Sequence, residues 1–356
     1  MVPGLALLDQ LSAAPEFEPL ESLVWFQSGR GVERQVLQGL EARLGGAQVD
    51  RVALAIEPPS GGAPSTARTL TRLLPEALRA RRALRRAGSQ VLVGLGGFTS
   101  APAGLAARSL GIPLVLLEIN AAPGRATRLL APLAREVWHA HAATCPGGRA
   151  DGRHRVMGAP VSPRFVRVQA PSRPAREALE LAPDGPLLVV LGGSQGAGAL
   201  NAFVRELAPR LVASGVQVIH QVGPGRLGEG AAPTAGYRPV EYAHEVPRLL
   251  AAADLVLCRG GASTLAEVGA VGVPAWVVPY PHHGDRHQER NAAALGAGAR
   301  VVQEEDLAGQ ADALLDLLGP GGEAARGAMR SALLDLVPAE AAAQQCARLR
   351  ALARPA

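Results

Sequence analysis

The sequence has 356 residues, of which 48% are hydrophobic and 19% charged, so it is long enough for two domains and too apolar for a disordered chain. Its formal net charge is +5, and all 36 strong bases are arginines, which favour forked contacts to phosphates and carboxylates. Aromatic residues make up only 3%, which argues against stacking on nucleic-acid bases, so we expect no nucleic-acid partner.

Short apolar runs alternate with helical patterns along the whole chain. In the first half the predicted strands are 23–27, 49–56, 90–95, 112–119, 136–140 and 154–158, with helices expected between them, for example over 64–87 and 102–110. In the second half the predicted strands are 186–193, 217–223, 254–261 and 274–280. Continuous apolar strands separated by helices are typical of parallel sheets covered on both faces. We therefore predict an α/β fold of two doubly wound domains, joined near the proline-rich stretch 158–165.

Glycine-rich stretches follow three of the predicted strands. They read GLGGFTSAPAG (94–104), LGGSQGAGALN (191–201) and CRGGASTLAE (258–267). Ligands of such sheets bind beyond the carboxyl ends of the strands, and a glycine turn at the start of a helix frees backbone N–H groups to bind phosphate. A single loop of this kind is most simply a tight turn, and Ser194 alone is most simply a helix cap. Three such loops together indicate a ligand that carries phosphate.

A lone carboxylate, Glu267, follows the third loop in an otherwise apolar stretch. An acid in the first turns of a helix is stabilised by the helix dipole by about 0.3–1 kcal/mol, which is one explanation for it. The other explanation is a sugar diol next to the phosphates, because the same arrangement holds the ribose of dinucleotides. The segment therefore predicts a nucleotide, with phosphates at Gly261, Ala262 and Ser263 and the ribose at Glu267.

The segment 279–292 concentrates polar side chains after the last of these strands. Asp285, His287, Gln288 and Asn291 can each hydrogen-bond a sugar. The histidine pair in this segment has no third ligand at a convincing spacing, and the chain contains no Asp-x-Asp element. We therefore predict no metal site and no cofactor.

The arginine-rich stretch 67–88 has leucines between its bases. Its arginines are residues 68, 72, 79, 81, 82, 85 and 86. This pattern suits peripheral binding to anionic lipid, and a solvated helix face accounts for it equally well.

Taken together, these motifs resemble glycosyltransferase family 28, the N-acetylglucosaminyltransferases that form lipid II. The resemblance spans essentially the whole chain, with GGSQGAGALN, CRGGASTLAEVGAVGVPA, PYPHHGDRHQERNA and GLGGFTSAPAGLAARSLGIPLVLLEIN as the matching motifs. It implies the GT-B fold, in which two Rossmann-like domains face each other across a cleft. The expected domains are 1–160 on the acceptor and membrane side and 161–335 on the UDP-sugar side, with a last helix within 336–356 that crosses back to the first.

The resemblance also implies an activity. The enzyme would move N-acetylglucosamine from UDP-N-acetylglucosamine, with inversion, to the 4-hydroxyl of the muramyl sugar of lipid I, the undecaprenyl-diphosphate-linked precursor, giving lipid II and UDP. It would work as a peripheral protein on an anionic membrane surface, at the cytoplasmic face of the cell membrane. Three alternatives remain open, namely another UDP-sugar-dependent GT-B transferase, a sugar-nucleotide epimerase and a non-catalytic UDP-sugar binder.

Site residues follow from the same resemblance. Glu267 would hold the ribose, the backbone of Ala243 the uracil, and Gln288 with His287 the N-acetylglucosamine hydroxyls. The full donor set is Asn120, Ser162, Arg164, Gly193, Ser194, Gln195, Gly196, Ala243, Ala262, Ser263, Thr264, Leu265, Ala266, Glu267, His287 and Gln288. The acceptor diphosphate would be held by Gly96, Gly97, Thr99 and Ser100.

The chain departs from the family pattern at three places. It has Leu117-Glu118-Ile119-Asn120 where the family has His-Glu-Gln-Asn, and Ser162 where the family has an arginine, which makes Arg164 the candidate replacement. It opens with the helix-like PGLALLDQLSAA, without the strand and the histidine-containing glycine loop that precede this helix in the family. We therefore assign no catalytic base and expect an unpaired inner edge in the first sheet. We also expect the in-frame upstream coding sequence to encode that strand and loop, and this chain to bind UDP but to transfer sugar poorly.

Overall fold

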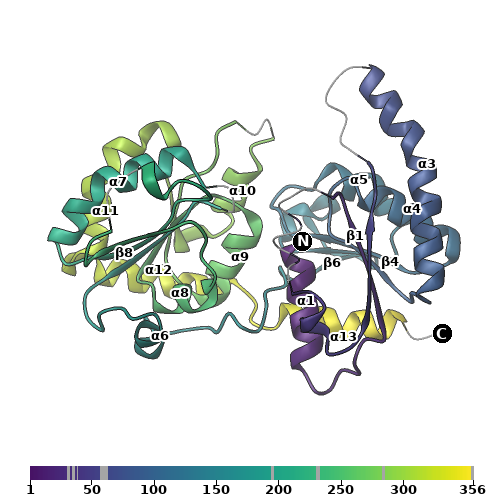
Figure 1. Cartoon of the computed structure of the whole chain (residues 1–356), viewed down its shortest axis with the longest axis horizontal. Helices are drawn as coiled ribbons and strands as arrows, with labels where there is room; N and C mark the ends of the chain where they lie inside the picture. The colour runs from purple at the N-terminus through teal and green to yellow at the C-terminus, as the bar shows by residue number, and fades with distance from the viewer. Residues whose placement is uncertain are drawn as a thin grey trace. The chain divides into compact units, whose positions relative to one another are not determined.

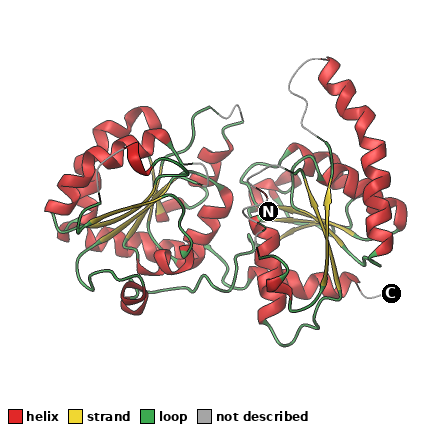
Figure 2. Ribbon diagram, viewed as in Figure 1, coloured by secondary structure: helices red, strands yellow, loops and turns green. Residues whose placement is uncertain are grey.

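A computed structural model describes residues 1–29, 33, 37, 39–56, 63–193, 196–229, 233–282 and 285–353. The polypeptide divides into two compact units, Met1–Pro163 with Glu340–Ala356, and Arg164–Ala339 (Figure 1). Each unit consists of parallel strands with helices packed against them (Figure 2). The predicted α/β class with two doubly wound units is therefore confirmed.

The described part of the first unit has six parallel strands in two separate sheets. One sheet pairs β1 (Ser22–Gln27) with β2 (Gln48–Ala53). The other has the order β3 (Leu92–Gly94), β4 (Leu114–Glu118), β5 (Glu136–His139) and β6 (His154–Val156). All five residues of β4 are buried, as expected for an apolar strand with both faces covered.

Helices cover both faces of these strands. They are α1 (Val2–Ala13), α3 (Ala63–Arg86), α4 (Ser100–Leu110), α5 (Arg125–Leu130) and α13 (Ala341–Ala353). Helices α1 and α13 lie against each other, and Leu7 and Cys346 pack with Val115 and Trp138 in one cluster. Helix α13 is fastened to β5 by Arg348, whose Nε lies 3.0 Å from the buried carboxylate of Glu136.

The second unit contains one six-stranded parallel sheet. Its order is β12 (Ala299–Val301), β11 (Ala275–Val277), β10 (Leu255–Cys258), β7 (Leu187–Leu191), β8 (Gln217–Gln221) and β9 (Tyr237–Val240). The sequence did not indicate β9 or β12, the two edge strands. Both are short, and β9 contains Pro239, which lacks the N–H that a central strand needs and is therefore confined to an edge.

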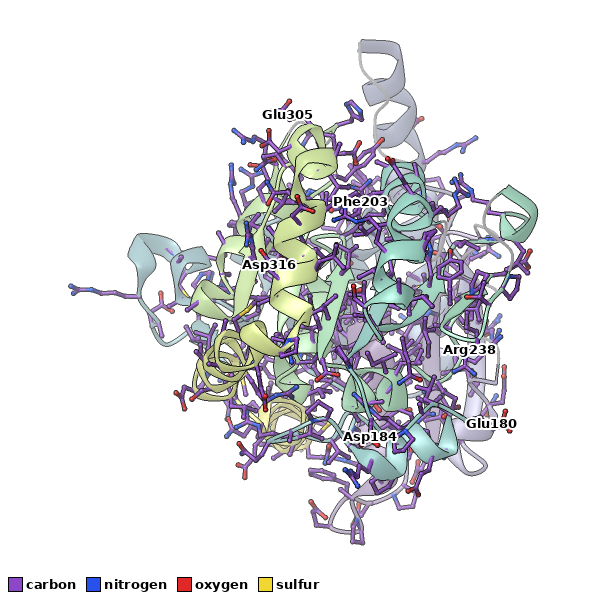
Figure 3. The ribbon with its side chains drawn as sticks, turned by 90° about the vertical axis from the view of Figure 1, so that its left-hand side faces the viewer. Glu180, Asp184, Phe203, Arg238, Glu305 and Asp316 are labelled. Carbon is purple, nitrogen blue, oxygen red and sulfur yellow. The ribbon has the colours of Figure 1, made fainter. Side chains whose placement is uncertain are left out.

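Helices cover both faces of this sheet as well. They are α6 (Arg173–Ala178), α7 (Gly198–Ala213), α8 (Val246–Ala252), α9 (Ala262–Val271), α10 (His287–Ala293), α11 (Ala311–Leu318) and α12 (Glu323–Leu336). Phe203 of α7 packs into the core, whereas Glu180, Asp184, Glu305 and Asp316 lie on the surface of the unit (Figure 3). Short 3-10 helices complete the two units at Ala42–Leu44, Ala131–Leu133, Ala142–Thr144, Pro146–Gly148, Leu227–Glu229, Gly296–Gly298, Glu304–Gln310 and Pro320–Gly322.

Candidate nucleotide-sugar site

The strand order of the second sheet reverses between β7 and β10. The chain runs outward from β7 to β8 and β9 on one side, and later returns to build β10, β11 and β12 on the other side. In doubly wound sheets, ligands bind at such a switch point, beyond the carboxyl ends of the strands. Two of the glycine-rich loops follow Leu191 and Cys258, the last residues of β7 and β10. The topology therefore brings these two loops to the same edge of the sheet.

The loop after β7 requires its glycines. Gly193 and Gly196 have φ of 84° and 72°, which side chains rarely adopt, and a Cβ on Gly196 would lie 2.2 Å from the carbonyl oxygen of Val222. The side chain of Gln221 donates a hydrogen bond to the Gly193 carbonyl at 3.1 Å. Helix α7 begins a few residues later, so the loop leads into a helix start. Ser194 and Gln195 lie outside the described residues.

The loop after β10 leads directly into α9. Gly261 is the N-cap of this helix, and it has no side chain that could cap the first turn. The backbone N–H groups there therefore need acceptors from elsewhere, and the helix dipole favours an anion. Ala262, Ser263, Thr264 and Ala266 are partly exposed, whereas Leu265 is buried in the core and offers only its backbone.

Glu267 lies on α9 with no hydrogen bond to its carboxylate from any described residue. The loss of water around it raises its pKa from 4.5 to about 7. A partly buried carboxyl group that receives no hydrogen bond from the described residues, next to a glycine loop at a switch point, is typical of a binding site. A vicinal diol would supply two O–H donors to it.

Side chains of helix α10 form hydrogen bonds with the loop after β10. The Gln288 side-chain oxygen accepts the backbone N–H groups of Gly260 at 3.1 Å and of Tyr280 at 3.0 Å, which leaves its NH2 group as a donor. Asn291 donates to the Gly260 carbonyl at 3.1 Å and is only 3% exposed, so its side chain supports the loop. The ring Nδ1 of His287 lies 2.6 Å from the Asp285 carboxylate, and this hydrogen bond lowers the pKa of Asp285.

Arg164 and Ala243 belong to neighbouring parts of the second unit. Ala243 is buried between β9 and α8, and the guanidinium of Arg164 lies 3.9 Å from the carboxylate of Glu245, two residues further on. Ser162 belongs to the first unit. Within the second unit, the structure therefore places Arg164 near the loop that contains Ala243.

The predicted acceptor residues form the turn between β3 and α4. Gly96 and Gly97 have φ of 82° and 75°, and the Ser100 hydroxyl donates to the Gly96 carbonyl at 2.7 Å. Thr99 is the N-cap of α4, without a side-chain capping bond. The Ser100 hydroxyl therefore closes this turn, and the exposed backbone of Gly97 and the Thr99 side chain remain for a ligand.

Glu118 organises the loop that carries Asn120. Its buried carboxylate accepts the backbone N–H and side-chain NH2 of Asn120 at 3.2 and 3.1 Å, the N–H of Gly124 at 2.7 Å and the hydroxyl of Thr127 at 2.7 Å. The sequence did not indicate a role for Glu118. The signal that identifies it is an acid at the end of a fully apolar strand, followed by Asn and Gly.

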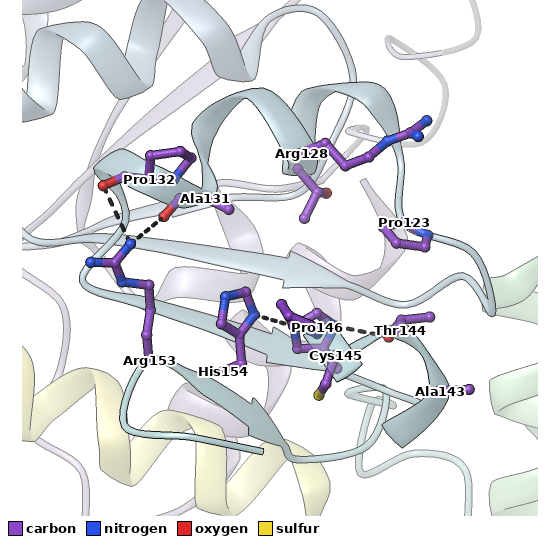
Figure 4. A pocket seen from close by; sticks show the side chains of 12 residues that line it. Pro123, Arg128, Ala131, Pro132, Ala143, Thr144, Cys145, Pro146, Arg153 and His154 are labelled. Carbon is purple, nitrogen blue, oxygen red and sulfur yellow. Dashed lines mark hydrogen bonds between the residues drawn. The ribbon is translucent and has the colours of Figure 1, made fainter. Parts of the chain in front are cut away.

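A separate cavity of about 480 Å³ lies elsewhere in the first unit and contains none of the predicted site residues (Figure 4). His139 and His154 contact each other there, with Nε2 and Nδ1 2.9 Å apart, and His139 also contacts the Thr144 hydroxyl at 2.8 Å. Burial, and then the neighbouring His154, lower the pKa of His139. Across the described residues, no group of three or more His, Cys, Asp or Glu side chains could hold a metal ion.

Two α/β units with parallel strands, one of which carries glycine loops at its switch point, are typical of the GT-B class of nucleotide-sugar proteins. The structure is similar to a crystal structure of Acinetobacter baumannii MurG, with a TM-score of 0.69, 23% sequence identity, and coverage of 98% of this chain and 95% of that one. It is also similar to a UDP-GlcNAc 2-epimerase from Neisseria meningitidis, with a TM-score of 0.63, 13% identity, and coverage of 98% and 96%. At these identities the likeness shows the fold alone.

The sequence comparisons resolve the family. The glycosyltransferase family 28 N-terminal domain matches residues 2–139 and the C-terminal domain matches residues 187–323. The chain is 38% identical over 314 residues to a UDP-N-acetylglucosamine--N-acetylmuramyl-(pentapeptide) pyrophosphoryl-undecaprenol N-acetylglucosamine transferase of Paenarthrobacter aurescens (strain TC1), covering 86% of this chain and 80% of that protein. It is 42% identical over 245 residues to the protein of the same name from Prochlorococcus marinus (strain MIT 9303), covering 67% of this chain and 65% of that protein. The chain belongs to glycosyltransferase family 28.

Proposed function

We propose that this protein transfers N-acetylglucosamine from UDP-N-acetylglucosamine to lipid I, forming lipid II and UDP in peptidoglycan synthesis. The relatives of the same family carry the name of this reaction. The observation that carries the proposal is Glu267, a partly buried carboxyl group to which no described residue donates a hydrogen bond, beside the start of α9 at the switch point. A UDP-sugar supplies what these groups lack, since its diphosphate is an acceptor for backbone N–H groups and its ribose donates two hydroxyls.

We propose the following roles for the other residues. The loops after β7 and β10 bind the diphosphate through Gly193, Ser194, Gln195, Gly196, Ala262, Ser263, Thr264, Leu265 and Ala266. Ala243 binds the uracil through its backbone, and Arg164, which lies 3.9 Å from Glu245 on the same loop, contributes to donor binding. The NH2 group of Gln288 and the ring of His287 bind the sugar. Asn120, Gly96, Gly97, Thr99 and Ser100 act from the first unit.

The chemistry is a displacement at the anomeric carbon. The 4-hydroxyl oxygen of the muramyl sugar forms the new bond, its proton is lost, and UDP leaves with the bonding electron pair. Backbone donors and the helix starts of α7 and α9 stabilise the negative charge that develops on the departing diphosphate. We assign no residue as the base that removes the proton.

A lipid acceptor requires a membrane surface, and the first unit provides the charge for one. It holds 21 arginines against 13 acidic residues, a net charge of +8, whereas the second unit holds 15 against 18, a net of −3. On α3, Leu74 and Leu78 are 67% and 46% exposed, and Arg79, Arg82, Arg85 and Arg86 are exposed beside them. Exposed leucines among arginines bind anionic bilayers peripherally, so we place the protein at the cytoplasmic face of the membrane. No helix of the described chain is long and apolar enough to cross a bilayer.

The test combines donor binding with transfer. Calorimetry with UDP-N-acetylglucosamine measures the first, and radiolabel transfer to a lipid I analogue measures the second, both with and without EDTA. We expect donor binding that EDTA leaves intact, and transfer of the label only when the acceptor is present. Conversion of the donor to its 2-epimer without any acceptor would identify an epimerase instead. Binding without transfer at any enzyme concentration would identify a sugar-nucleotide binder.

A further inference from the structure

The loop after β8 is a further glycine-rich turn at the carboxyl edge of the second sheet. It reads Val-Gly-Pro-Gly-Arg over residues 222–226, and Gly223 and Gly225 have φ of 95° and 71°. Strand β8 lies beside β7, so this loop leaves the sheet next to the loop after β7. None of its residues has a role in the donor site proposed above.

The loops after β7 and β8 are in direct contact. A Cβ on Gly196 would lie 2.2 Å from the carbonyl oxygen of Val222 and 3.2 Å from the Cα of Gly223, so the two backbones touch. The Val222 carbonyl also accepts a hydrogen bond of 2.8 Å from the buried side chain of Asn201 on α7. The fold therefore fixes the position of the loop after β8 relative to the loop after β7.

Arg226 is the last residue of this turn, and its side chain reaches the start of α7. Its Nη1 lies 3.9 Å from the position that a Cβ on Gly198, the first residue of the helix, would take. The carboxylate of Glu241 accepts the backbone N–H of Gly225 at 2.8 Å, which holds the turn in place. A partly buried arginine therefore lies where the loop after β7 becomes a helix.

The guanidinium of Arg226 has no counter-charge within the fold. Among the described residues, none forms a hydrogen bond or an ion pair with it. The start of α7 repels it as well, because the aligned backbone N–H groups give a helix a partial positive charge at this end. Two positive groups side by side favour an anion that contacts both of them.

Three other arginines near the site loops already form ion pairs with acids of the second unit. The pairs are Arg164–Glu245, Arg259–Glu304 and Arg286–Glu289. A diphosphate that used one of these arginines would have to share it with its acid or displace that acid. Arg226 is available to a ligand without such a loss.

We propose that Arg226 binds the diphosphate of the nucleotide-sugar donor. A guanidinium presents parallel N–H donors that match the oxygens of a phosphate group. Together with the backbone N–H groups of the loop after β7, Arg226 surrounds the diphosphate with positive charge and stabilises UDP as it leaves. This inference rests on the proposed function, because it requires a UDP-sugar as the ligand.

Calorimetry with UDP and with uridine tests this role. Uridine lacks the diphosphate, so the loss of a phosphate contact changes only the affinity for UDP. We expect Arg226→Gln to weaken UDP binding by roughly tenfold or more and uridine binding by less than about twofold. Arg226→Lys keeps the charge but not the forked donors, and its loss of UDP affinity should be intermediate. Because Arg226 has no partner among the described residues, the melting temperature of the empty protein should not fall in either variant.

Arg210→Gln is the matched control, since it removes the same charge from the other end of α7. Arg210 is exposed and forms its ion pair with Asp312. It lies about 18 Å further along the helix axis than Gly198, more than the Debye length of about 8 Å at physiological salt. We expect this variant to bind UDP with the affinity of the parent chain, so a loss in Arg226→Gln alone reports a local contact.

The possible failures of the two proposals are distinguishable. A parent chain that binds UDP, together with an Arg226→Gln variant that binds it equally well, would overturn the role of Arg226 alone. An equal loss of uridine affinity in Arg226→Gln would also overturn it, because the residue would then support the loop and not contact the diphosphate. A parent chain that binds neither UDP nor UDP-N-acetylglucosamine would overturn the proposed function, and the role of Arg226 with it.

Discussion

Gln288 on α10 holds Gly260 of the loop after β10 through a hydrogen bond of 3.1 Å to the Gly260 N–H. The backbones of the two residues are also close, because a Cβ on Gly260 would lie only 2.3 Å from the backbone carbonyl oxygen of Gln288. The side-chain oxygen of Gln288 is therefore committed to the fold, and only its NH2 group remains for a ligand.

Because the side-chain oxygen of Gln288 serves the fold and its NH2 group is left for a ligand, we expect different outcomes for two substitutions. Gln288→Glu retains an acceptor for Gly260 and Tyr280 but loses the donor, so stability and UDP affinity should persist while UDP-N-acetylglucosamine binds up to about tenfold more weakly. Gln288→Leu leaves the backbone N–H groups of Gly260 and Tyr280 without an acceptor. It should therefore lower the free energy of unfolding by about 1–3 kcal/mol. Calorimetry with both ligands and thermal melts distinguish the two. Equal loss of UDP and UDP-sugar affinity in Gln288→Glu would remove the sugar contact from this residue.

Glu267→Gln should weaken donor binding and stabilise the empty protein. The folded pKa of about 7 lies above the ordinary 4.5, so the folded state holds the extra proton and loses stability as the pH rises from about 4.5 to 7. At pH 8 the variant should therefore be more stable than the parent by about 1–3 kcal/mol. UDP affinity should fall by a similar amount in free energy, because a carboxylate accepts the ribose hydroxyls more strongly than an amide does.

The exposed Glu206 on α7 provides the control for this pair of measurements, since Glu206→Gln should change neither quantity. If Glu267→Gln left UDP affinity unchanged, its carboxylate would interact only with the dipole of α9.

Leu74→Ser with Leu78→Ser should reduce binding to vesicles of any charge. Arg82→Glu with Arg86→Glu should reduce binding only to anionic vesicles, by tenfold or more at low salt, because each basic residue near the surface contributes about 1 kcal/mol. Sedimentation with neutral and anionic vesicles at two salt concentrations measures both effects. Leu129, 65% exposed on α5, is the matched control, and a loss of the same size in Leu129→Ser would show that α3 has no special role.

Arg348→Ala should detach α13 from the first sheet. Burial alone would raise the pKa of Glu136, but hydrogen bonds from Arg348 and Trp138 outweigh it and lower the pKa. The contribution of the pair is therefore complete above the unfolded pKa of about 4.5 and is lost as the pH falls through the lower, folded pKa. We expect the variant to be destabilised by about 1.5–3 kcal/mol at pH 7 and by much less near pH 3. Gln344→Ala, at an exposed position on the same helix, controls for helix propensity, and a pH-independent difference would contradict the ion pair.

Apolar periodicity predicted the central strands because burial on both faces requires it. Leu187–Leu191 and Leu114–Glu118 are read directly from the sequence for this reason. The edge strands β9 and β12 were not predicted from the sequence. An edge strand faces solvent on one side and therefore tolerates Arg238, Pro239 and Arg300. The glycine loops were also predictable, because positive φ at Gly193 and Gly196 leaves few alternatives.

Two polar side chains beside the glycine loops are used by the fold itself. Asn291 and Ser100 have the chemistry of ligand contacts, and the fold uses both of them to hold backbone carbonyls of glycine loops. Sequence alone does not reveal which polar group is turned inward, since that depends on tertiary packing. The same limit applies to Glu118, whose four hydrogen bonds come from residues up to nine positions away.

The assignment of Glu340–Ala356 to the first unit has a consequence for biosynthesis. Domains generally fold as they leave the ribosome, with the amino-terminal domain first. Here the order is reversed, because Arg164–Ala339 is continuous and can fold once it has emerged, whereas the first unit waits for the last helix to be released. Until translation terminates, Leu7, Trp138 and their neighbours lack the Cys346 and Leu349 side chains that cover them. A nascent chain stalled before residue 340 therefore exposes this apolar surface to chaperones.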